Sequence, residues 1–135
     1  MVIDTSAVVA IALHEPSREF LLDAIRSAVT RTVSSVTLME AGIVLRARSG
    51  QEGVEALYDF LENQSIETAG FDKAQAQAAI SAFERFGKGM GHRVQLNFGD
   101  CAVYGLASLR GEPLLATGNG FAGTDLTVIG PTSGS

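Results

Sequence analysis

The sequence predicts an α/β fold, a three-layer α/β/α sandwich in which helices cover both faces of a parallel sheet. Short apolar segments alternate with amphipathic segments along the chain, which is the pattern that builds parallel sheets. The segment "DCAVYGLASL" carries no charge between Asp100 and Arg110, as expected of a central buried helix. With 135 residues, of which 46% are apolar, the chain is long enough to form one domain over residues 1–135.

The first elements are predicted to be a strand followed by two helices. Val2–Ile3 is short and apolar, and a helix over about residues 5–13 follows it. Pro16 ends this stretch because proline has no backbone N–H with which to continue a helix. Ser17 is then placed to cap the second helix, "REFLLDAIRSA".

A second strand, "TVSS", leads into a long helix that we expect to begin at Ser35 or Thr37. That helix should end at Gly50, because glycine is the residue that most often follows a helix end. The next segment, "QEGVEALYDFLENQ", has the periodicity of a separate amphipathic helix.

The rest of the chain is predicted to add three strands and two helices. Asp72 is placed to cap the alanine-rich helix "KAQAQAAISAFERF". The glycine-rich segment "GKGMGHRVQLNFG" has no periodic pattern and is predicted to be an irregular loop before the charge-free helix. The predicted strands are "SIETAGF", "PLLAT" and "LTVIG".

The composition excludes several classes of protein. A net charge of -5 argues against binding nucleic acid through bulk positive charge, so a nucleic-acid enzyme with this sequence must concentrate its cations locally. A single cysteine, Cys101, cannot form an intramolecular disulfide, which favours a reducing, cytoplasmic location. The apolar run "AVVAIAL" is too short to span a bilayer, so we expect no membrane association.

Three carboxylates occupy positions where a charge is costly. Asp4 directly follows the first strand, and Asp100 opens the charge-free helix. Because strand ends and the helix starts that follow them converge on one crevice of a parallel sheet, these two acids are expected to face each other. Glu40 lies on a helical stripe that is otherwise apolar, and burying it without a partner would cost several kcal/mol. The other residues of that stripe are Val36, Met39, Ile43, Val44 and Ala47.

Each carboxylate also has a simpler structural explanation. Asp4 could serve only to cap the first helix. Asp100 could form a capping box with Asn97, three residues earlier. Glu40 could lie at the edge of its stripe, in solvent. The predicted site disappears only if all three explanations hold together.

A cluster of carboxylates without histidine or cysteine forms an oxygen-only site, and Mg²⁺ or Mn²⁺ is the cation that such ligands select. Divalent ions held in this way activate water and stabilise the charge that develops on a phosphate. The residues therefore favour phosphodiester hydrolysis. Cations in and just before the glycine-rich loop would steer phosphates towards such a site. They are Arg85, Lys88, His92 and Arg93.

Four longer segments carry a resemblance to a known family. They are "VIDTSAVVAI", "VTLMEAGIVL", "FERFGKGMGHRVQLNFGDCAVYGLA" and "PLLATGNGFAGTDL". In this order and at this spacing they resemble a PIN-domain ribonuclease of the VapC toxin type. The resemblance implies a PIN-like domain that cleaves RNA with Mg²⁺ or Mn²⁺, forms a homodimer and is inhibited by a VapB-type antitoxin. By the same resemblance, Asp4, Glu40 and Asp100 take the catalytic metal-site positions.

The sequence departs from that family at one place. Many relatives carry an acidic residue within the segment that reads Gly118–Phe121 here, and this chain has none. Asn119 and Asp125 are therefore accessory candidates for the fourth ligand. Further accessory candidates, next to the predicted acids, are Thr5, Ser6 and Asn97. The missing acid leaves an alternative open, in which a catalytically weakened PIN-like module binds RNA or an antitoxin without cleaving.

Overall fold

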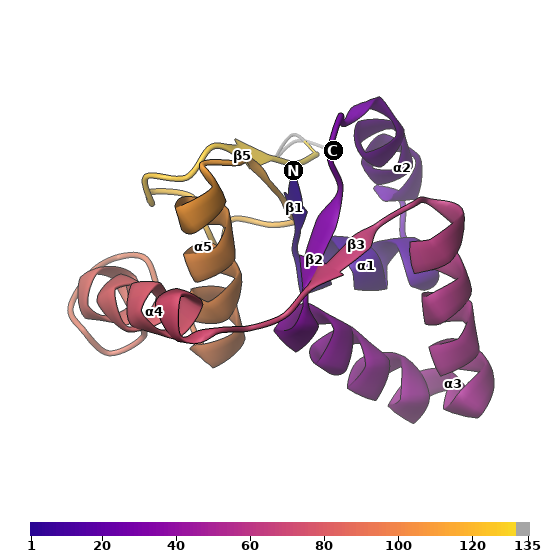
Figure 1. The fold of residues 1–135 in the computed structure, drawn as a ribbon, viewed down its shortest axis with the longest axis horizontal. Helices are drawn as coiled ribbons and strands as arrows, with labels where there is room; N and C mark the ends of the chain where they lie inside the picture. The colour runs from indigo at the N-terminus through magenta and orange to yellow at the C-terminus, as the bar shows by residue number, and fades with distance from the viewer. Residues whose placement is uncertain (132–135) are drawn as a thin grey trace.

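The structure is a computed structural model that describes residues 1–131, and its sheet has five strands that all run parallel. The strand order is β3-β2-β1-β4-β5, so β1 lies at the centre (Figure 1). The strands are β1 (Val2–Ile3), β2 (Thr32–Ser34), β3 (Glu67–Ala69), β4 (Leu114–Leu115) and β5 (Val128–Ile129). The carboxyl end of β1 therefore lies in the middle of one edge of the sheet, between the ends of β2 and β4.

Helices cover both faces of this sheet (Figure 1). On one face lie α1 (Thr5–Ala12), α2 (Arg18–Ser27) and α3 (Ser35–Asn63). On the other face lie α4 (Lys73–Phe86) and α5 (Phe98–Arg110). The predicted α/β/α sandwich around a parallel sheet is confirmed.

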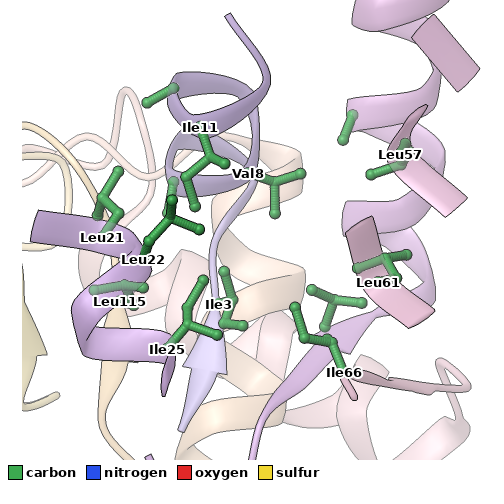
Figure 2. Packing of buried hydrophobic residues seen from close by; sticks show 14 of the residues in the cluster. Ile3, Val8, Ile11, Leu21, Leu22, Ile25, Leu57, Leu61, Ile66 and Leu115 are labelled. Carbon is green, nitrogen blue, oxygen red and sulfur yellow. The ribbon is translucent and has the colours of Figure 1, made fainter. Parts of the chain in front are cut away.

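The sheet divides the hydrophobic core into two clusters. Successive strand residues point to opposite faces, so Ile3 joins the cluster under α1, α2 and α3, whereas Val2 joins the cluster under α4 and α5. Leu115 and Leu114 divide in the same way. Figure 2 shows the first cluster, whose members include Val8, Leu21, Ile25, Leu57 and Leu61. The central strands are thus packed from both sides, which fixes where their ends lie.

Most helices begin and end at the capping and helix-breaking residues predicted from the sequence. Asp72 accepts a hydrogen bond from the Gln75 N–H over 2.9 Å, and α4 spans Lys73–Phe86 as predicted. Ser17 occupies the N-cap position of α2, although its side chain makes no capping hydrogen bond. Gly50 interrupts the helical backbone with φ 65° and ψ -153°, so the two helices predicted on either side of it join as one bent α3. A residue without a Cβ adopts this conformation without strain.

The predicted burial of the apolar stripe around Glu40 is wrong, because much of that stripe faces solvent. Met39 is 55% exposed and Ile43 is 62% exposed. The buried residues in this part of α3 are Thr37, Ala41 and Leu45. The first half of α3 carries apolar residues on two sides, and packing against α1 and the sheet decides which side is covered.

Two predictions about the chain as a whole can be placed beside the structure. Within residues 1–131, no helix has both the length and the apolar character needed to cross a membrane. The single domain predicted over residues 1–135 stays a prediction, and residues 132–135 lie outside the described part of the chain.

Gly105 lets α4 and α5 approach closely, and replacing it should loosen their contact. A Cβ at this position would lie 2.8 Å from the Gln75 carbonyl oxygen and 3.3 Å from the Ala79 nitrogen, both in the backbone of α4. Gly105→Ala should therefore lower the free energy of unfolding by about 1–3 kcal/mol. Chemical denaturation measures the change, and Ser108→Ala, at an exposed position of the same helix, is the control. Equal stability of Gly105→Ala and wild type would contradict this account.

Candidate active site

Asp4 lies where the central strand ends and α1 begins. Its Oδ2 accepts a hydrogen bond from the Ser6 N–H over 3.0 Å, so it caps the helix. The residue is only 6% exposed. Burial raises the pKa of the Asp4 carboxyl, and hydrogen bonds from Ser6 and Thr5 act in the opposite direction. The end of β1 therefore holds a carboxylate whose charge the chain compensates only in part.

Glu40, on α3, lies between α1 and α5. Thr5 Oγ1 donates a hydrogen bond to Glu40 Oε1 over 2.9 Å. On the other side the carboxylate lies against Gly99, where an added Cβ would come 2.5 Å from Oε2. Because Gly99 has no side chain, there is room for the Glu40 carboxylate to pack against α5 at this position. This role was not predicted, and the only signal in the sequence was a glycine directly before Asp100.

Asp100 lies in the first turn of α5, beside Gly99. The Asn97 N–H donates to Asp100 Oδ2 over 3.1 Å and the Asp100 N–H donates to Asn97 Oδ1 over 2.9 Å, which completes a capping box. Burial raises the pKa of the Asp100 carboxyl, and the negative charges of Asp4 and Glu40 raise it further. The structure thus brings Asp4 and Glu40 close enough to Asp100 for their charges to raise the pKa of its carboxyl.

The simpler explanations hold for the two aspartates without removing the cluster. Asp4 is the N-cap of α1, and Asp100 completes the capping box of α5 together with its N-cap, Asn97. A cap occupies one carboxylate oxygen, and within residues 1–131 the other oxygen of Asp100 has no hydrogen-bond partner. Glu40 is half-buried and bound to Thr5, so it does not lie free in solvent. The capping hydrogen bonds of Asp4 and Asp100 are therefore compatible with a further role of these carboxylates as metal ligands.

The donor chemistry of this cluster fits a hard divalent cation. Carboxylates from three elements repel one another, and a cation among them would relieve that repulsion. As the side chains lie, no group of three or more acidic, histidine or cysteine side chains among residues 1–131 is placed to hold a metal ion. The three side chains have the oxygen donors and the negative charge that a divalent cation requires. To coordinate such an ion, however, the carboxylates would have to move closer together.

Two accessory candidates have very different surroundings. Ser6 belongs to the cluster, and its Oγ accepts a hydrogen bond from the Thr117 N–H over 3.0 Å, which ties the end of β4 to α1. Asp125 has partners of its own, because the Tyr104 hydroxyl donates to its Oδ1 and Arg85 Nη1 lies 3.7 Å from its Oδ2. The hydrogen bond from Tyr104 holds the pKa of the Asp125 carboxyl below its ordinary value. Asp125 therefore braces the loop before β5.

The predicted phosphate-steering cations also differ in their surroundings. Arg85 takes part in the brace just described and lies over the Phe86 ring, 4.6 Å from its centroid. His92 packs edge-on against the same ring, with the ring centroids 5.2 Å apart. Lys88 and Arg93 are exposed and form no ion pair within the described residues. Two of the four cations are thus held by structural contacts, and two are free to meet a ligand.

Asn119, the neutral candidate for a fourth ligand, is exposed in the loop that follows β4. It lines a pocket together with Arg93 and Gln95 from the loop that precedes α5. The structure therefore places Asn119 beside one of the two free cations.

Comparison with known proteins identifies the family. Residues 1–125 match the PIN domain family. The chain belongs to this family. It is 43% identical to "Ribonuclease VapC" of Mycolicibacterium smegmatis (strain ATCC 700084 / mc(2)155), covering 96% of this chain and 99% of that protein. It is 39% identical to "Ribonuclease VapC30" of Mycobacterium tuberculosis (strain ATCC 25618 / H37Rv), covering 96% and 98%. The predicted resemblance to VapC-type PIN domains is confirmed.

Solved structures share the fold at low sequence identity. Mycobacterium tuberculosis VapC20, described as a Sarcin-Ricin loop cleaving toxin, has a TM-score of 0.76 and 14% identity, covering 93% of this chain and 95% of that one. VapBC2 from Rickettsia felis, bound to a DNA fragment from its promoter, has a TM-score of 0.73 and 16% identity, covering 96% of both chains. These likenesses support the α/β/α architecture.

Removing the Asp100 charge should stabilise the metal-free protein at neutral pH. The pKa of Asp100 is raised in the folded state, so its ionised form opposes folding above the ordinary aspartate value of 3.8. Asp100→Asn should raise the melting temperature in EDTA by a few degrees at pH 7. This difference should shrink as the pH falls through the raised pKa, because the wild-type carboxyl then takes up a proton, and it should vanish below 3.8.

Asp125→Asn is the matched control, because the pKa of Asp125 is lowered and not raised. Its ionised form favours folding, so the variant should melt lower than wild type at pH 7 and should approach it at acid pH. Thermal unfolding across pH measures both variants. A lower melting temperature for Asp100→Asn at pH 7 in EDTA would contradict the raised pKa of Asp100, to which burial contributes most and the charges of Asp4 and Glu40 contribute less.

Proposed function

We propose that this chain is an Mg²⁺- or Mn²⁺-dependent endoribonuclease, the toxin of a toxin–antitoxin pair, which hydrolyses RNA phosphodiester bonds. The observation that carries the proposal is the meeting of Asp4, Glu40 and Asp100 from three elements of a PIN domain. The names of the 43% and 39% identical relatives, both ribonucleases of the VapC type, support it.

Asp4, Asp100 and Glu40 are the residues that would hold the ion. A bound divalent ion would supply positive charge to activate water and to stabilise the phosphate as negative charge develops on it. The cluster is anionic and partly desolvated, which favours a divalent cation over a monovalent one. We propose both ions because carboxylate oxygens suit either of them.

The protein groups have separate tasks in this proposal. The hydrogen bonds at the starts of α1 and α5 fix one oxygen of Asp4 and one of Asp100, which limits the ordering that is still needed when the carboxylates close around an ion. Glu40 is fixed by the Thr5 hydroxyl through Oε1, which leaves Oε2 to orient the attacking water and accept its proton. Lys88 and Arg93 bring the RNA backbone to this acidic surface.

The partners are proposed from proteins of the same fold. The Rickettsia felis structure is a VapBC2 assembly with promoter DNA, and a Klebsiella pneumoniae neighbour is a toxin–antitoxin complex. We infer that a VapB-type antitoxin inhibits this chain, that the chain acts as a homodimer and that it works in the cytoplasm. Copurification with a small partner protein encoded beside it, followed by mass measurement of the complex, tests this assembly.

Asp4→Asn separates the charge of Asp4 from its cap. Asparagine caps helices as well as aspartate does, so the fold should be kept while the carboxylate is lost. The variant should cleave RNA at least about 100-fold more slowly than wild type, since a metal contributes several kcal/mol to such reactions. The assay incubates the antitoxin-free chain with total RNA and Mn²⁺. Undiminished cleavage by the folded variant would overturn the proposal, and RNA binding without cleavage by wild type would favour the non-cleaving alternative.

Gly99→Ala tests the placement of Glu40. The three atoms nearest to the new Cβ would all belong to the Glu40 carboxylate, at the end of a flexible side chain, so the carboxylate should turn away from Thr5 and the fold should survive. We expect cleavage to fall about as far as in Glu40→Ala, with an unchanged melting temperature. In Glu40→Ala, adding Gly99→Ala should cause little further loss, because both changes remove the same carboxylate from the site. Additive losses in the double variant would refute this link.

A further inference from the structure

A polar pocket of about 330 Å³ lies between two loops that flank the acid cluster. One loop leads into α5, and its Gln95 lies two residues before the cap Asn97. The other loop follows β4, and its Asn119 lies two residues after Thr117, which is tied to Ser6 in α1. The pocket is lined by Arg93, Val94, Gln95, Asn119, Gly120, Ala122 and Gly123. Each of its two loops is therefore linked, within a few residues of the chain, to the start of a helix at which Asp4 or Asp100 lies.

Arg93 is held in this pocket by a close contact with the opposite loop. Gly123 has φ +90°, and a Cβ there would lie 3.0 Å from Arg93 Nη2 and 3.3 Å from Nε. The glycine thus lets the guanidinium lie along the loop backbone. Arg93 forms no ion pair within residues 1–131, and no acid lines the pocket. An anionic group entering the pocket would meet an uncompensated positive charge.

Two side-chain amides add hydrogen-bonding groups to this charge. The Asn119 carbonyl of the backbone accepts from the Ala122 N–H, whereas its side-chain amide has no partner within the described part of the chain. Gln95 Nε2 donates to the His92 carbonyl oxygen over 2.8 Å, which orients the amide and leaves its Oε1 as an acceptor. The pocket therefore offers a cation, a free amide and an oriented acceptor. Amides of this kind pair with the edges of nucleobases, and a guanidinium binds phosphate.

We propose that this pocket binds one nucleotide of the RNA beside the cleaved phosphodiester, with Arg93 on its phosphate and Asn119 and Gln95 on its base. The volume lies at the lower end of the range for small-ligand sites, which suits one nucleotide and not a longer segment. The inference rests on the proposed function and gives it a source of base preference. Asn119 then contacts RNA and is not a metal ligand.

Binding of short homopolymer RNAs of each of the four bases tests the pocket apart from catalysis. The Asp4→Asn chain is used in EDTA, so that neither metal nor cleavage contributes. Arg93→Gln should weaken binding of every homopolymer about tenfold or more and reduce the salt dependence of binding. Asn119→Ala should weaken binding of one or two homopolymers far more than the others. Uniform or absent effects of Asn119→Ala would overturn the base contact.

Gly123→Ala has a close control in Gly89→Ala. Both glycines have nearly the same positive φ, +90° and +88°, but a Cβ at Gly89 would meet nothing within 4 Å. Strain from the alanine is therefore alike. Gly123→Ala differs in that its Cβ would press on Arg93 and on the Val94 Cγ2 atom, 3.1 Å away. We expect Gly123→Ala to reproduce the loss caused by Arg93→Gln and Gly89→Ala to bind as wild type does. Equal binding by both alanine variants would refute the placement of Arg93.

Sequencing of the RNA ends produced by the wild-type active site distinguishes this inference from the proposed function. If wild type cleaves, Asn119→Ala should change the bases found next to the cut. Cleavage at unchanged positions by Asn119→Ala would overturn the pocket and leave the ribonuclease proposal standing. RNA binding that depends on Arg93 and Asn119, in a wild type that never cleaves, would support the pocket and overturn the ribonuclease proposal.

Discussion

The burial of Asp4 at the end of the central strand is the constraint on which the rest of the site depends. A carboxylate that is 6% exposed is costly to ionise, and the first turn of α1 offsets only part of that cost with its N–H groups. The chain then places two more acids, Glu40 and Asp100, near it. Local hydrogen bonds therefore hold carboxylates of like charge near one another despite their repulsion. A bound cation would stabilise such an arrangement.

The hydrogen bonds that Asp4 and Asp100 accept at helix starts oppose the electrostatic repulsion between the carboxylates. A cap fixes one oxygen of a carboxylate to the backbone, so the position of the charge is set by a helix start and not by a flexible side chain. In α5 the same box also orders Asn97, and through it the approach of the loop that carries Arg93 and Gln95. The same hydrogen bonds thus serve the fold and the proposed site, and the capping roles of Asp4 and Asp100 leave the proposed ligand role open to both.

The sequence was sufficient where local rules decide the outcome. Asp72 and Gly50 marked a helix start and a break because capping and positive φ act within a few residues. Asp4 and Asp100 were expected to meet because parallel sheets gather strand ends at one edge. Glu40 was predicted to belong to the site because its apolar stripe was expected to be buried, but that stripe is largely exposed. The actual position of the Glu40 carboxylate depends on the space left by Gly99, 59 residues further along the sequence. Contacts of that kind arise from packing, and no local pattern encodes them.

In the loops around the candidate site, some basic side chains of this acidic chain form structural contacts, and others stay unpaired and can bind a ligand. Arg85 is about as close in sequence to the candidate site as Lys88, yet it is bound to Asp125 and stacked on an aromatic ring, so its charge stabilises the fold. That brace, with the hydroxyl of Tyr104, holds the loop whose other end carries Asn119. With a net charge of -5, the chain should repel a polyanion such as the proposed RNA at long range and attract it only where a cation is left unpaired. Arg93 meets that condition in the pocket that it shares with Asn119 and Gln95. In the proposed site its charge would hold a phosphate whatever the base, and the two amides would supply the base preference.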